Sequence, residues 1–318
     1  MSLRDTLIPG ELEKQLAGLT FQLTGSVRSR VLGQHQGSSA GSSLEFAKHK
    51  EYVPGDDLRT VNWKVSARLN RMLVKQFVQE ASSTAMILLD ASPSMQFGEE
   101  SDRKFFKACQ LVATLSWILL RQGDRVGLVV FSGNKVVDRV PAQQIASHHL
   151  VIMECLERNL LTRVQRDNSS SKPPEAIMQI AQIERWADSS IMLISDFLFD
   201  FERSFKMLSE LRKLNTTSFL FHMIHPTEYY PSIRGERVDW TRNTEAAFNF
   251  SRAGRFRSPE TGQAVLADPG AVRREYLERY RQYLAELKQA ASESMIRYDH
   301  MITNDPIESL LFRFSGQV

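Results

Sequence analysis

The sequence has few cysteines, no long apolar run and almost no net charge, and each shortage excludes a class of protein. Only two of its 318 residues are cysteine, Cys109 and Cys155. Both lie in stretches with helical spacing, so we expect buried thiols in a reducing compartment rather than a disulfide. No stretch of about 18 apolar residues is present to span a bilayer. A secretory signal is not expected either, because the opening residues, MSLRDTLIPGELEKQL, carry acids and lack an apolar centre. We therefore expect a cytoplasmic protein.

The overall charge and composition do not point to a particular partner. Forty basic residues nearly cancel 37 acidic ones, which leaves a formal net charge of +3. Hydrophobic residues make up 42% of the chain and charged residues 24%, values typical of a globular protein. A chain of this length can bury about three quarters of its unfolded surface as one unit. We expect one large α/β domain with appended pieces.

The most informative stretch is TAMILLDASPSM, residues 84–95. Ala85 to Leu89 are too few and too uniformly apolar for a half-exposed helix, which indicates a buried central strand. Asp90, Ser92 and Ser94 follow the strand's carboxyl end, where open α/β sheets place their ligand sites. On an extended turn these alternate side chains point the same way, so a carboxylate and two hydroxyls can face one Mg²⁺ or Mn²⁺ ion.

A second apolar strand that ends in an acid strengthens this interpretation. The segment SIMLISDFLFD, residues 190–200, places Asp196 directly after its apolar run. If the two strands are parallel neighbours, Asp196 lies close to Asp90, and the carboxylates repel unless one is protonated or a cation lies between them. The pattern DxSxS alone is not specific, because a solvated Asx or Ser turn has the same residues. The paired strands favour a metal site.

Periodicity predicts the remaining elements of the chain. Leu12, Leu16 and Leu19 recur at helical spacing, which predicts a short amphipathic helix docked on the rest of the protein. Further helices are expected over 101–120 with Ser101 as the cap, and over 143–160, 175–187 and 271–293. Strands are expected over 125–131, 135–140, 216–224 and 296–303.

The segment from Leu44 to Ser82 contains the dense motif EYVPGDDLRTVNW. Asn62 is expected to cap a short helix through Leu69, and residues 72–78 alternate like a strand. Asp56 and Asp57 could be metal ligands or general acids, and together with Arg59 and Trp63 they form a structural motif or a possible partner interface. Turn carboxylates more often accept backbone N–H groups and pair with a nearby arginine, which favours a structural clamp built on Asp57 and Arg59.

These motifs together resemble a known family. The pieces EF, EYVPGDD, R, NW, AR and VKQF between Glu45 and Phe77, followed by LLDASPSM, resemble the bacterial domain of unknown function 58 (DUF 58), whose core is a von Willebrand factor type A domain. The resemblance continues through RQGDRVGLVVFS, LISDF and SPETGQAV. The family usually reads GDDxRxIDW in the middle motif, where this chain has Asn62 in place of the aspartate.

The resemblance implies a fold and a division into domains. It implies an α/β, Rossmann-like, mostly parallel sheet flanked by helices, with an N-terminal α+β extension. Residues 1–82 are expected to form that extension. Residues 83–318 are expected to form the von Willebrand A-like domain, with a β-ribbon insertion around 233–268.

The resemblance also implies a metal-ion-dependent adhesion site. Asp90, Ser92 and Ser94 would bind the ion directly, and Asp196 would bind it directly or through water. The family's Thr-Asp pair before the helix at 175–187 is missing from this chain. Ser170 or Ser171 stands nearest the expected place, whereas Thr162 matches the residue type but lies too early in the sequence. We assign the third hydroxyl to Ser171.

The function implied is that of a non-enzymatic, metal-dependent protein-binding adaptor. Genes of the family commonly sit beside MoxR-type AAA+ ATPases, so such an ATPase is the expected partner and would supply an Asp or Glu to the metal. One alternative is a nucleic-acid-binding protein that uses the Arg-rich, aromatic stretch 234–257. Another is a metal-dependent phosphohydrolase, although Ser92 stands where haloacid-dehalogenase-like sites need a second Asp.

Overall fold

A computed structural model describes residues 7–8, 10–16, 18–21, 23, 44–79, 83–133, 135–162, 174–184, 186–198, 201–228, 254–258 and 262–315. The chain divides into two compact units. Unit 1 comprises Met1–Leu23 and Ser83–Val318, and unit 2 comprises Thr24–Ser82. The first residues of the chain thus belong to the same compact unit as its second half.

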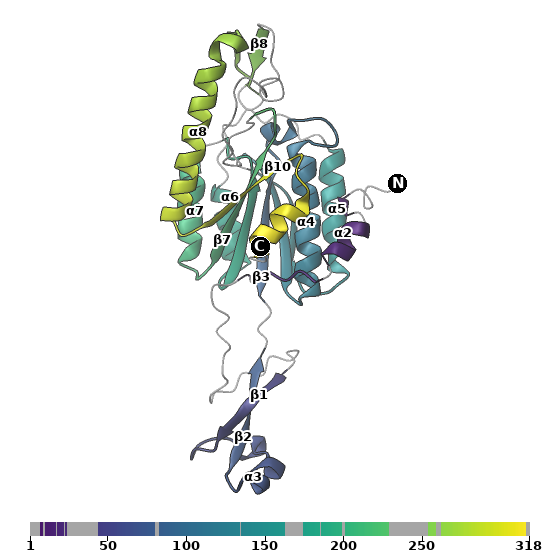
Figure 1. Ribbon diagram of the computed structural model, residues 1–318, viewed down its shortest axis with the longest axis vertical. Helices are drawn as coiled ribbons and strands as arrows, with labels where there is room; N and C mark the ends of the chain where they lie inside the picture. The colour runs from purple at the N-terminus through teal and green to yellow at the C-terminus, as the bar shows by residue number, and fades with distance from the viewer. Residues whose placement is uncertain are drawn as a thin grey trace. The chain divides into compact units, whose positions relative to one another are not determined.

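Unit 1 is built on a six-stranded sheet with the strand order β10-β7-β6-β3-β4-β5 (Figure 1). Its strands are β3 (Thr84–Asp90), β4 (Arg125–Ser132), β5 (Lys135–Gln143), β6 (Ser189–Ser195), β7 (Thr217–Ile224) and β10 (Arg297–Ile302). All neighbours pair in parallel except β5, which is antiparallel to β4 at one edge. Numbered along the chain within this sheet, the order is 3-2-1-4-5-6, the doubly wound arrangement. The expected Rossmann-like α/β fold with a mostly parallel sheet is confirmed.

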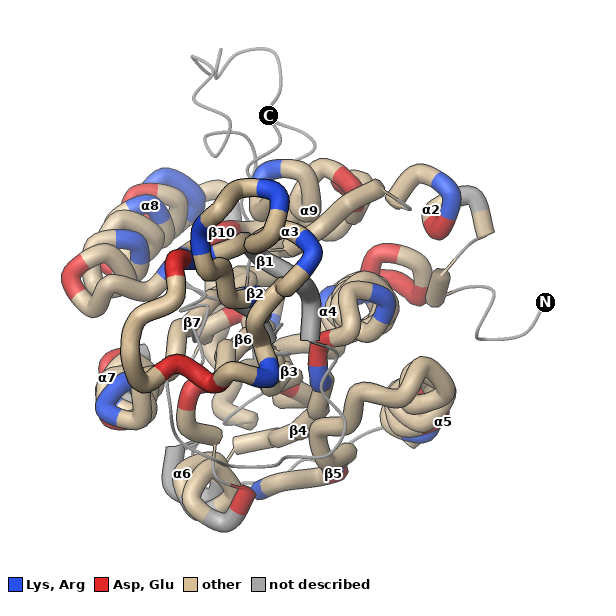
Figure 2. The backbone as a smooth tube through the Cα atoms, turned by 90° about the horizontal axis from the view of Figure 1, so that it is seen from below, with Lys and Arg blue, Asp and Glu red and all other residues tan. Residues whose placement is uncertain are grey.

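Helices cover both faces of this sheet, as the view in Figure 2 shows. On one face lie α4 (Lys104–Arg121), α5 (His148–Leu161) and α9 (Ile307–Ser315); on the other lie α6 (Pro174–Ile183), α7 (Phe201–Arg212) and α8 (Pro269–Glu293). Successive side chains of β3 point to opposite faces of the sheet, as in any β-strand. Ile87 and Leu89 pack in the core that includes α4 and α5, and Met86 and Leu88 pack in the core that includes α6 and α7.

The N-terminal segment docks on unit 1, as its leucine spacing predicts. Its helix is α2 (Gly10–Gln15), and Leu12, Leu16 and Leu19 are buried in the core that includes α4 and α9. The side chain of Gln122 bonds both the backbone N–H and the carbonyl of Phe21. The segment is therefore part of the main hydrophobic core.

Three predicted helix boundaries were wrong. Helix α4 begins at Lys104 rather than Ser101, and Arg103 stands at its N-cap without a side-chain cap bond. Helix α5 begins at His148 rather than residue 143, because β5 continues through Gln143. The strand can contain Pro141 because β5 lies at the sheet edge, where a missing N–H leaves no ladder bond unmade. Helix α6 ends at Ile183, before the predicted residue 187.

A short hairpin occupies the end of the predicted β-ribbon insertion. Strands β8 (Gly254–Arg257) and β9 (Ala264–Ala267) pair antiparallel, within the range 233–268. Residues 229–253, which include Trp240, Phe248 and Phe250 of the Arg-rich stretch, lie outside the described residues.

Unit 2 is a two-stranded sheet with a short helix. Strand β1 (Leu44–Glu51) pairs antiparallel with β2 (Leu73–Gln79), and η1 (Leu58–Thr60) and α3 (Trp63–Leu69) lie between them in sequence. Asn62 caps α3, as predicted, by accepting the Val65 N–H at 3.3 Å. Within the described ranges of both units, no helix combines the length and apolar character needed to cross a membrane.

Candidate functional site

The two acid-ended strands are parallel neighbours, as the sequence predicts. In their register Leu89 of β3 stands opposite Ile194 of β6, which sets Asp90 level with Ser195 and next to Asp196. The Ser195 hydroxyl donates to Asp90 Oδ2 at 2.5 Å. The carboxyl ends of these strands therefore bring Asp90 and Asp196 into one buried cluster, each 1% exposed.

The turn after β3 brings its hydroxyl groups together. The Ser92 N–H donates to Asp90 Oδ1 at 2.8 Å, and the hydroxyls of Ser92 and Ser94 lie 3.1 Å apart. A 3₁₀ turn, η2 (Pro93–Gln96), starts with Pro93 and holds this spacing. Asp90, Ser92 and Ser94 thus meet in space, as their alternate spacing predicts.

The Asp90 carboxyl is electrostatically unusual. Burial raises its pKa to about 7, and the negative charge of Asp196 adds to the rise, although the bonds from Ser195 and Ser92 oppose it. A buried carboxylate next to a second carboxylate is costly unless a positive charge compensates it. Asp90 therefore has the character of a group that either holds a proton or faces a cation.

A buried lysine, which the sequence analysis missed, supplies one positive charge. Lys104 is the first residue of α4 and its side chain is 0% exposed. Its amine lies 2.7 Å from Asp196 Oδ2 and 2.7 Å from Glu228 Oε1. Burial alone lowers the pKa of Lys104, but the charges of Asp196 and Glu228 outweigh it and hold the pKa above its usual value. Lys104 is therefore a buried ammonium inside the candidate site.

One sequence signal for Lys104 existed. A cation in the first turn of a helix meets the positive end of the helix dipole, so it is unfavourable there unless acids surround it. The partners that make Lys104 favourable lie 92 and 124 residues away, beyond any local pattern. A lysine at the start of a helix is unusual in the sequence, but its carboxylate partners are identified only in the folded structure.

A turn after β7 covers the cluster from one side. In this turn the His225 N–H donates to Glu228 Oε2 at 3.2 Å, and His225 Nε2 lies 3.1 Å from Asp102 Oδ2. The Phe97 ring stands edge-on to the His225 ring, with 5.0 Å between their centroids. Asp90, Ser92, Ser94, Lys104 and Asp196 are each at most 4% exposed, so the site is closed in this conformation.

The backbone beside Asp196 is strained. Phe197 has φ 51°, a left-handed conformation that bulky residues rarely adopt. The Tyr283 hydroxyl of α8 donates to the Phe197 carbonyl, and the Phe197 ring packs edge-on against His222. Strain of this kind persists only where the surroundings enforce it, and it clusters at functional sites. Helix α8 therefore helps to hold the strand end that carries Asp196.

The cluster fits a hard divalent cation in its donor atoms. Two carboxylates and two adjacent hydroxyls are oxygen ligands of the kind that Mg²⁺ and Mn²⁺ prefer. Among the described residues no group of three or more His, Cys, Asp or Glu side chains is arranged to hold a metal, so the two serines are essential to this assignment. Ser171 lies outside the described residues. Asp196 is shared with Lys104, which the prediction did not foresee.

The motif of unit 2 forms a local turn. Asp56 accepts the Val53 N–H at 2.9 Å and lies 3.3 Å from the Lys50 amine. Asp57 accepts the backbone N–H of Arg59 at 2.9 Å, and we find no ion pair between their side chains in the described part of the chain. These contacts confirm that the turn carboxylates accept backbone N–H groups. The contact between Asp57 and Arg59 differs from the side-chain pairing expected for a clamp, and an interface role for the motif stays a prediction.

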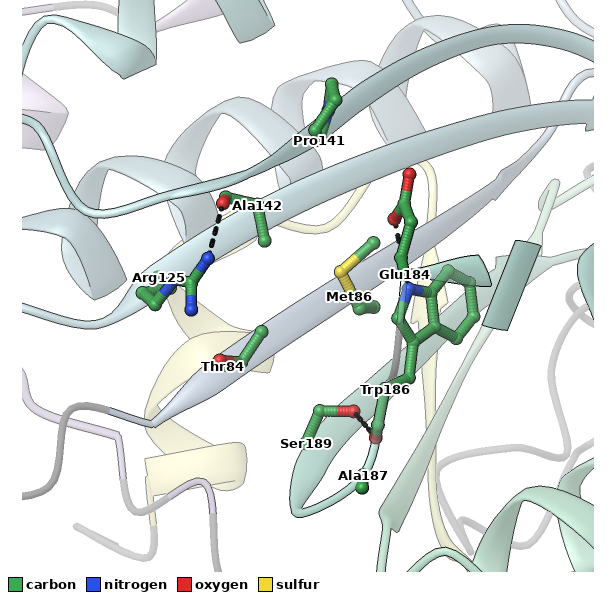
Figure 3. A pocket seen from close by; sticks show the side chains of 9 residues that line it. All are labelled: Thr84, Met86, Arg125, Pro141, Ala142, Glu184, Trp186, Ala187 and Ser189. Carbon is green, nitrogen blue, oxygen red and sulfur yellow. Dashed lines mark hydrogen bonds between the residues drawn. The ribbon is translucent and has the colours of Figure 1, made fainter. Parts of the chain in front are cut away.

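A pocket of about 250 Å³ lies away from this cluster, at the opposite ends of the strands (Figure 3). It is lined by Thr84, Met86, Arg125, Pro141, Ala142, Glu184, Trp186, Ala187 and Ser189. Its polar groups bond to one another or to the backbone: Arg125 donates to the Ala142 carbonyl and the Trp186 indole donates to Glu184. The predicted site residues do not line it.

Comparisons with solved structures give loose likenesses. An aerotolerance-related membrane protein from Bacteroides fragilis is 15% identical, with a TM-score of 0.44, and the match covers 74% of this chain and 100% of that one. The protein BatB from Bacteroides thetaiotaomicron is 14% identical over 74% of this chain and 97% of that one, with a TM-score of 0.44. The von Willebrand A domain of SpRpn10 is 16% identical over 52% of this chain and 86% of that one, with a TM-score of 0.32. Scores this low say nothing of function.

Sequence comparisons give the family. An uncharacterised protein of Mycobacterium tuberculosis is 27% identical over 154 residues, which is 48% of each chain. The uncharacterised protein YeaD of Bacillus subtilis is 26% identical over 152 residues, 46% of this chain and 34% of that one. The chain spans about half or less of the length of the curated relatives it matches. Residues 48–219 match the profile described as "Protein of unknown function DUF58". Since this match covers more than half of its length, the chain belongs to the DUF58 family.

Proposed function

We propose that the protein is a non-enzymatic, metal-dependent protein-binding module. Asp90, Ser92 and Ser94 would bind Mg²⁺ or Mn²⁺ directly, and Asp196 would bind it directly or through water. The observation that carries this proposal is the buried Asp90 carboxylate, placed beside the paired hydroxyls of Ser92 and Ser94 and near a second carboxylate. Ser171 is kept as the proposed third hydroxyl.

The charge balance of the cluster supports a divalent cation. Asp90, Asp196 and Glu228 bring three carboxylates, and Lys104 brings one ammonium. With all four groups ionised, the cluster carries an excess of two negative charges, and three of the four side chains are at most 1% exposed. A buried excess of this size is unfavourable until a cation neutralises it. A divalent ion has the charge that is missing.

The partner that we propose is a MoxR-type AAA+ ATPase, which would contribute an Asp or Glu to the ion. Two apolar side chains beside the site support a protein partner: Phe97 is 36% exposed and Leu198 is 45% exposed. They offer the apolar contacts that a single coordinating carboxylate needs around it, since a stable interface buries on the order of 1,000 Å² or more. In this proposal the protein acts in the cytoplasm as an adaptor in assembly or remodelling.

Covalent phosphotransfer is the less favoured alternative. Asp90 is the strand-end acid that would act as nucleophile, but it is 1% exposed and bonded at both oxygens. The position two residues later, where a second acid is needed, is Ser92. Among the described residues of the stretch 234–257, we find no observation that favours nucleic-acid binding over the adaptor role.

The proposal is tested by measuring binding to the ATPase with and without the ion. We expect binding in Mg²⁺ or Mn²⁺ to be lost in excess chelator and in Asp90→Ala, and we expect the two changes together to add little, since both remove the same bond. The matched control is Asp188→Ala, an exposed acid that bonds Asn215. Undiminished binding in chelator would refute the metal-dependent mechanism even if the two proteins are partners.

A further inference from the structure

The Lys104 ammonium binds a carboxylate that the proposed function gives to a metal ion. It is fully buried, it lies 2.7 Å from Asp196, and it sits in the cluster that also contains Asp90. Because Asp196 is a proposed ligand of the ion, Lys104 and the ion need the same carboxylate. Two cations that need one carboxylate either share it against their mutual repulsion or exclude each other.

The second partner of Lys104 connects the cluster to its cover. Glu228 holds the Lys104 amine with Oε1 at 2.7 Å and accepts the His225 N–H with Oε2 at 3.2 Å. Glu228 is the most exposed of the three partners, with 15% of its side chain exposed against 0% for Lys104 and 1% for Asp196. Glu228 therefore links the buried ammonium to the turn 225–228. Glu228 and Lys104 thus form an ion pair within the chain.

We propose that Lys104 is a built-in competitor of the divalent cation, so that cation binding displaces the ammonium from Asp196 and releases the turn 225–228 that closes the site. This inference rests on the proposed metal site and adds its regulation. It explains how a site that is closed in this structure becomes open to a partner's carboxylate. The opening follows from the loss of the Lys104–Glu228 ion pair, and partner access is thereby linked to the presence of the ion.

The first test is the affinity of the full chain for Mn²⁺, measured by calorimetry or by the electron paramagnetic resonance of free Mn²⁺. Lys104→Met removes the competing charge and is expected to raise the affinity about tenfold or more. Lys213→Met is the matched control, since Lys213, directly after α7, is 71% exposed and pairs only with Glu210 in the part of the chain that the structure describes. Unchanged affinity in a folded Lys104→Met variant would overturn the inference.

The variant Glu228→Gln distinguishes displacement of Lys104 from a fixed Lys104, because the two cases predict opposite changes in Mn²⁺ affinity. If Lys104 moves away when the ion binds, loss of Glu228 loosens the ammonium, frees Asp196 and raises Mn²⁺ affinity about threefold or more. If Lys104 is a fixed neighbour, loss of a negative charge lowers the affinity instead. A lower affinity in Glu228→Gln therefore refutes displacement.

Hydrogen exchange of the wild-type protein tests the release directly. The peptide that contains residues 225–228 is expected to exchange faster at saturating Mn²⁺, and this effect should be absent in Asp90→Ala. Unchanged exchange in a protein that demonstrably binds Mn²⁺ overturns the inference and leaves the proposed function standing. Failure of every variant and of the wild type to bind Mn²⁺ refutes the proposed metal site itself.

Discussion

Asp90 makes the stability of the metal-free protein depend on pH. Its pKa in the folded protein is about 7, above its value of 3.8 in an unfolded chain, so the folded state holds the proton more tightly. The stabilisation is complete below pH 4 and is lost as pH rises through 7. In chelator, we expect the free energy of unfolding of wild type to fall by on the order of 3 kcal/mol between pH 4 and pH 8 relative to Asp90→Asn.

Urea denaturation of both proteins across this pH range measures the difference. Asn cannot ionise, so the variant lacks this contribution while keeping a side chain of similar size. Saturating Mg²⁺ should restore the wild type at pH 8, since the ion stabilises the charged carboxylate. Parallel pH profiles of the two proteins would show that the Asp90 pKa is not raised.

The predicted metal ligands could be foreseen from the sequence, whereas Lys104 could not. Asp90, Ser92 and Ser94 are close in sequence, and strand alternation fixes their common direction. Asp196 followed from the rule that parallel strands end at one edge. Lys104 could not be derived, because its two carboxylate partners meet it only after three distant segments pack together.

Among the elements, the loop from β3 to α4 depends on a glycine. Gly98 has φ 110°, and a Cβ there would lie 2.9 Å from the Arg103 Cα and 3.0 Å from the His225 ring. We expect Gly98→Ala to lower the free energy of unfolding by about 2 to 4 kcal/mol, from backbone strain together with crowding. The variant should also weaken Mn²⁺ binding, because the loop that precedes Lys104 has to shift.

Gly262→Ala is the matched control for this loop. Gly262 also has a positive φ, 70°, but nothing lies within 4 Å of its Cβ position, so only the backbone strain of about 1 kcal/mol applies. Thermal or urea denaturation compares the two variants. Equal losses would show that crowding at Gly98 contributes nothing.

The sheet was the most predictable element, and the helix starts were the least. Uniformly apolar strands such as β3 and β6 stand out because both of their faces are buried. The start of α5 was misplaced because β5 continues through Pro141 to Gln143, and an edge strand can contain a proline. The start of α4 was misplaced because Ser101 resembles a cap, while tertiary contacts of Lys104 set the boundary.

In the whole molecule, unit 2 is an insertion within unit 1. The Leu23 carbonyl accepts the Ser190 hydroxyl at 2.5 Å, and Ser190 stands opposite Ala85 in the sheet. The chain therefore leaves unit 1 at Leu23 and returns at Ser83 close to the same point. Residues 24–82 are bounded by positions that a short linker can join.

We expect replacement of residues 24–82 by a short Gly/Ser linker to leave unit 1 folded. Among the residues that the structure describes, its core, from the N-terminal leucines to α9, consists of residues of unit 1 alone. The shortened protein should unfold cooperatively and bind Mn²⁺ within about threefold of the full chain, because the site lies wholly in unit 1. Circular dichroism and calorimetry measure both properties. A molten shortened protein would show that unit 1 depends on unit 2 for its stability.

The insertion also sets an order of events during synthesis. The Phe21 ring packs against Phe314 of α9, with 5.3 Å between ring centroids, so the two ends of the described chain share one core. A ribosome releases Phe21 long before Phe314. Unit 2, whose contacts are local, can fold while the rest is still being made. Phe21 therefore lacks its aromatic partner until α9 has been synthesised, and we expect the N-terminal segment to be a binding segment for a chaperone during translation.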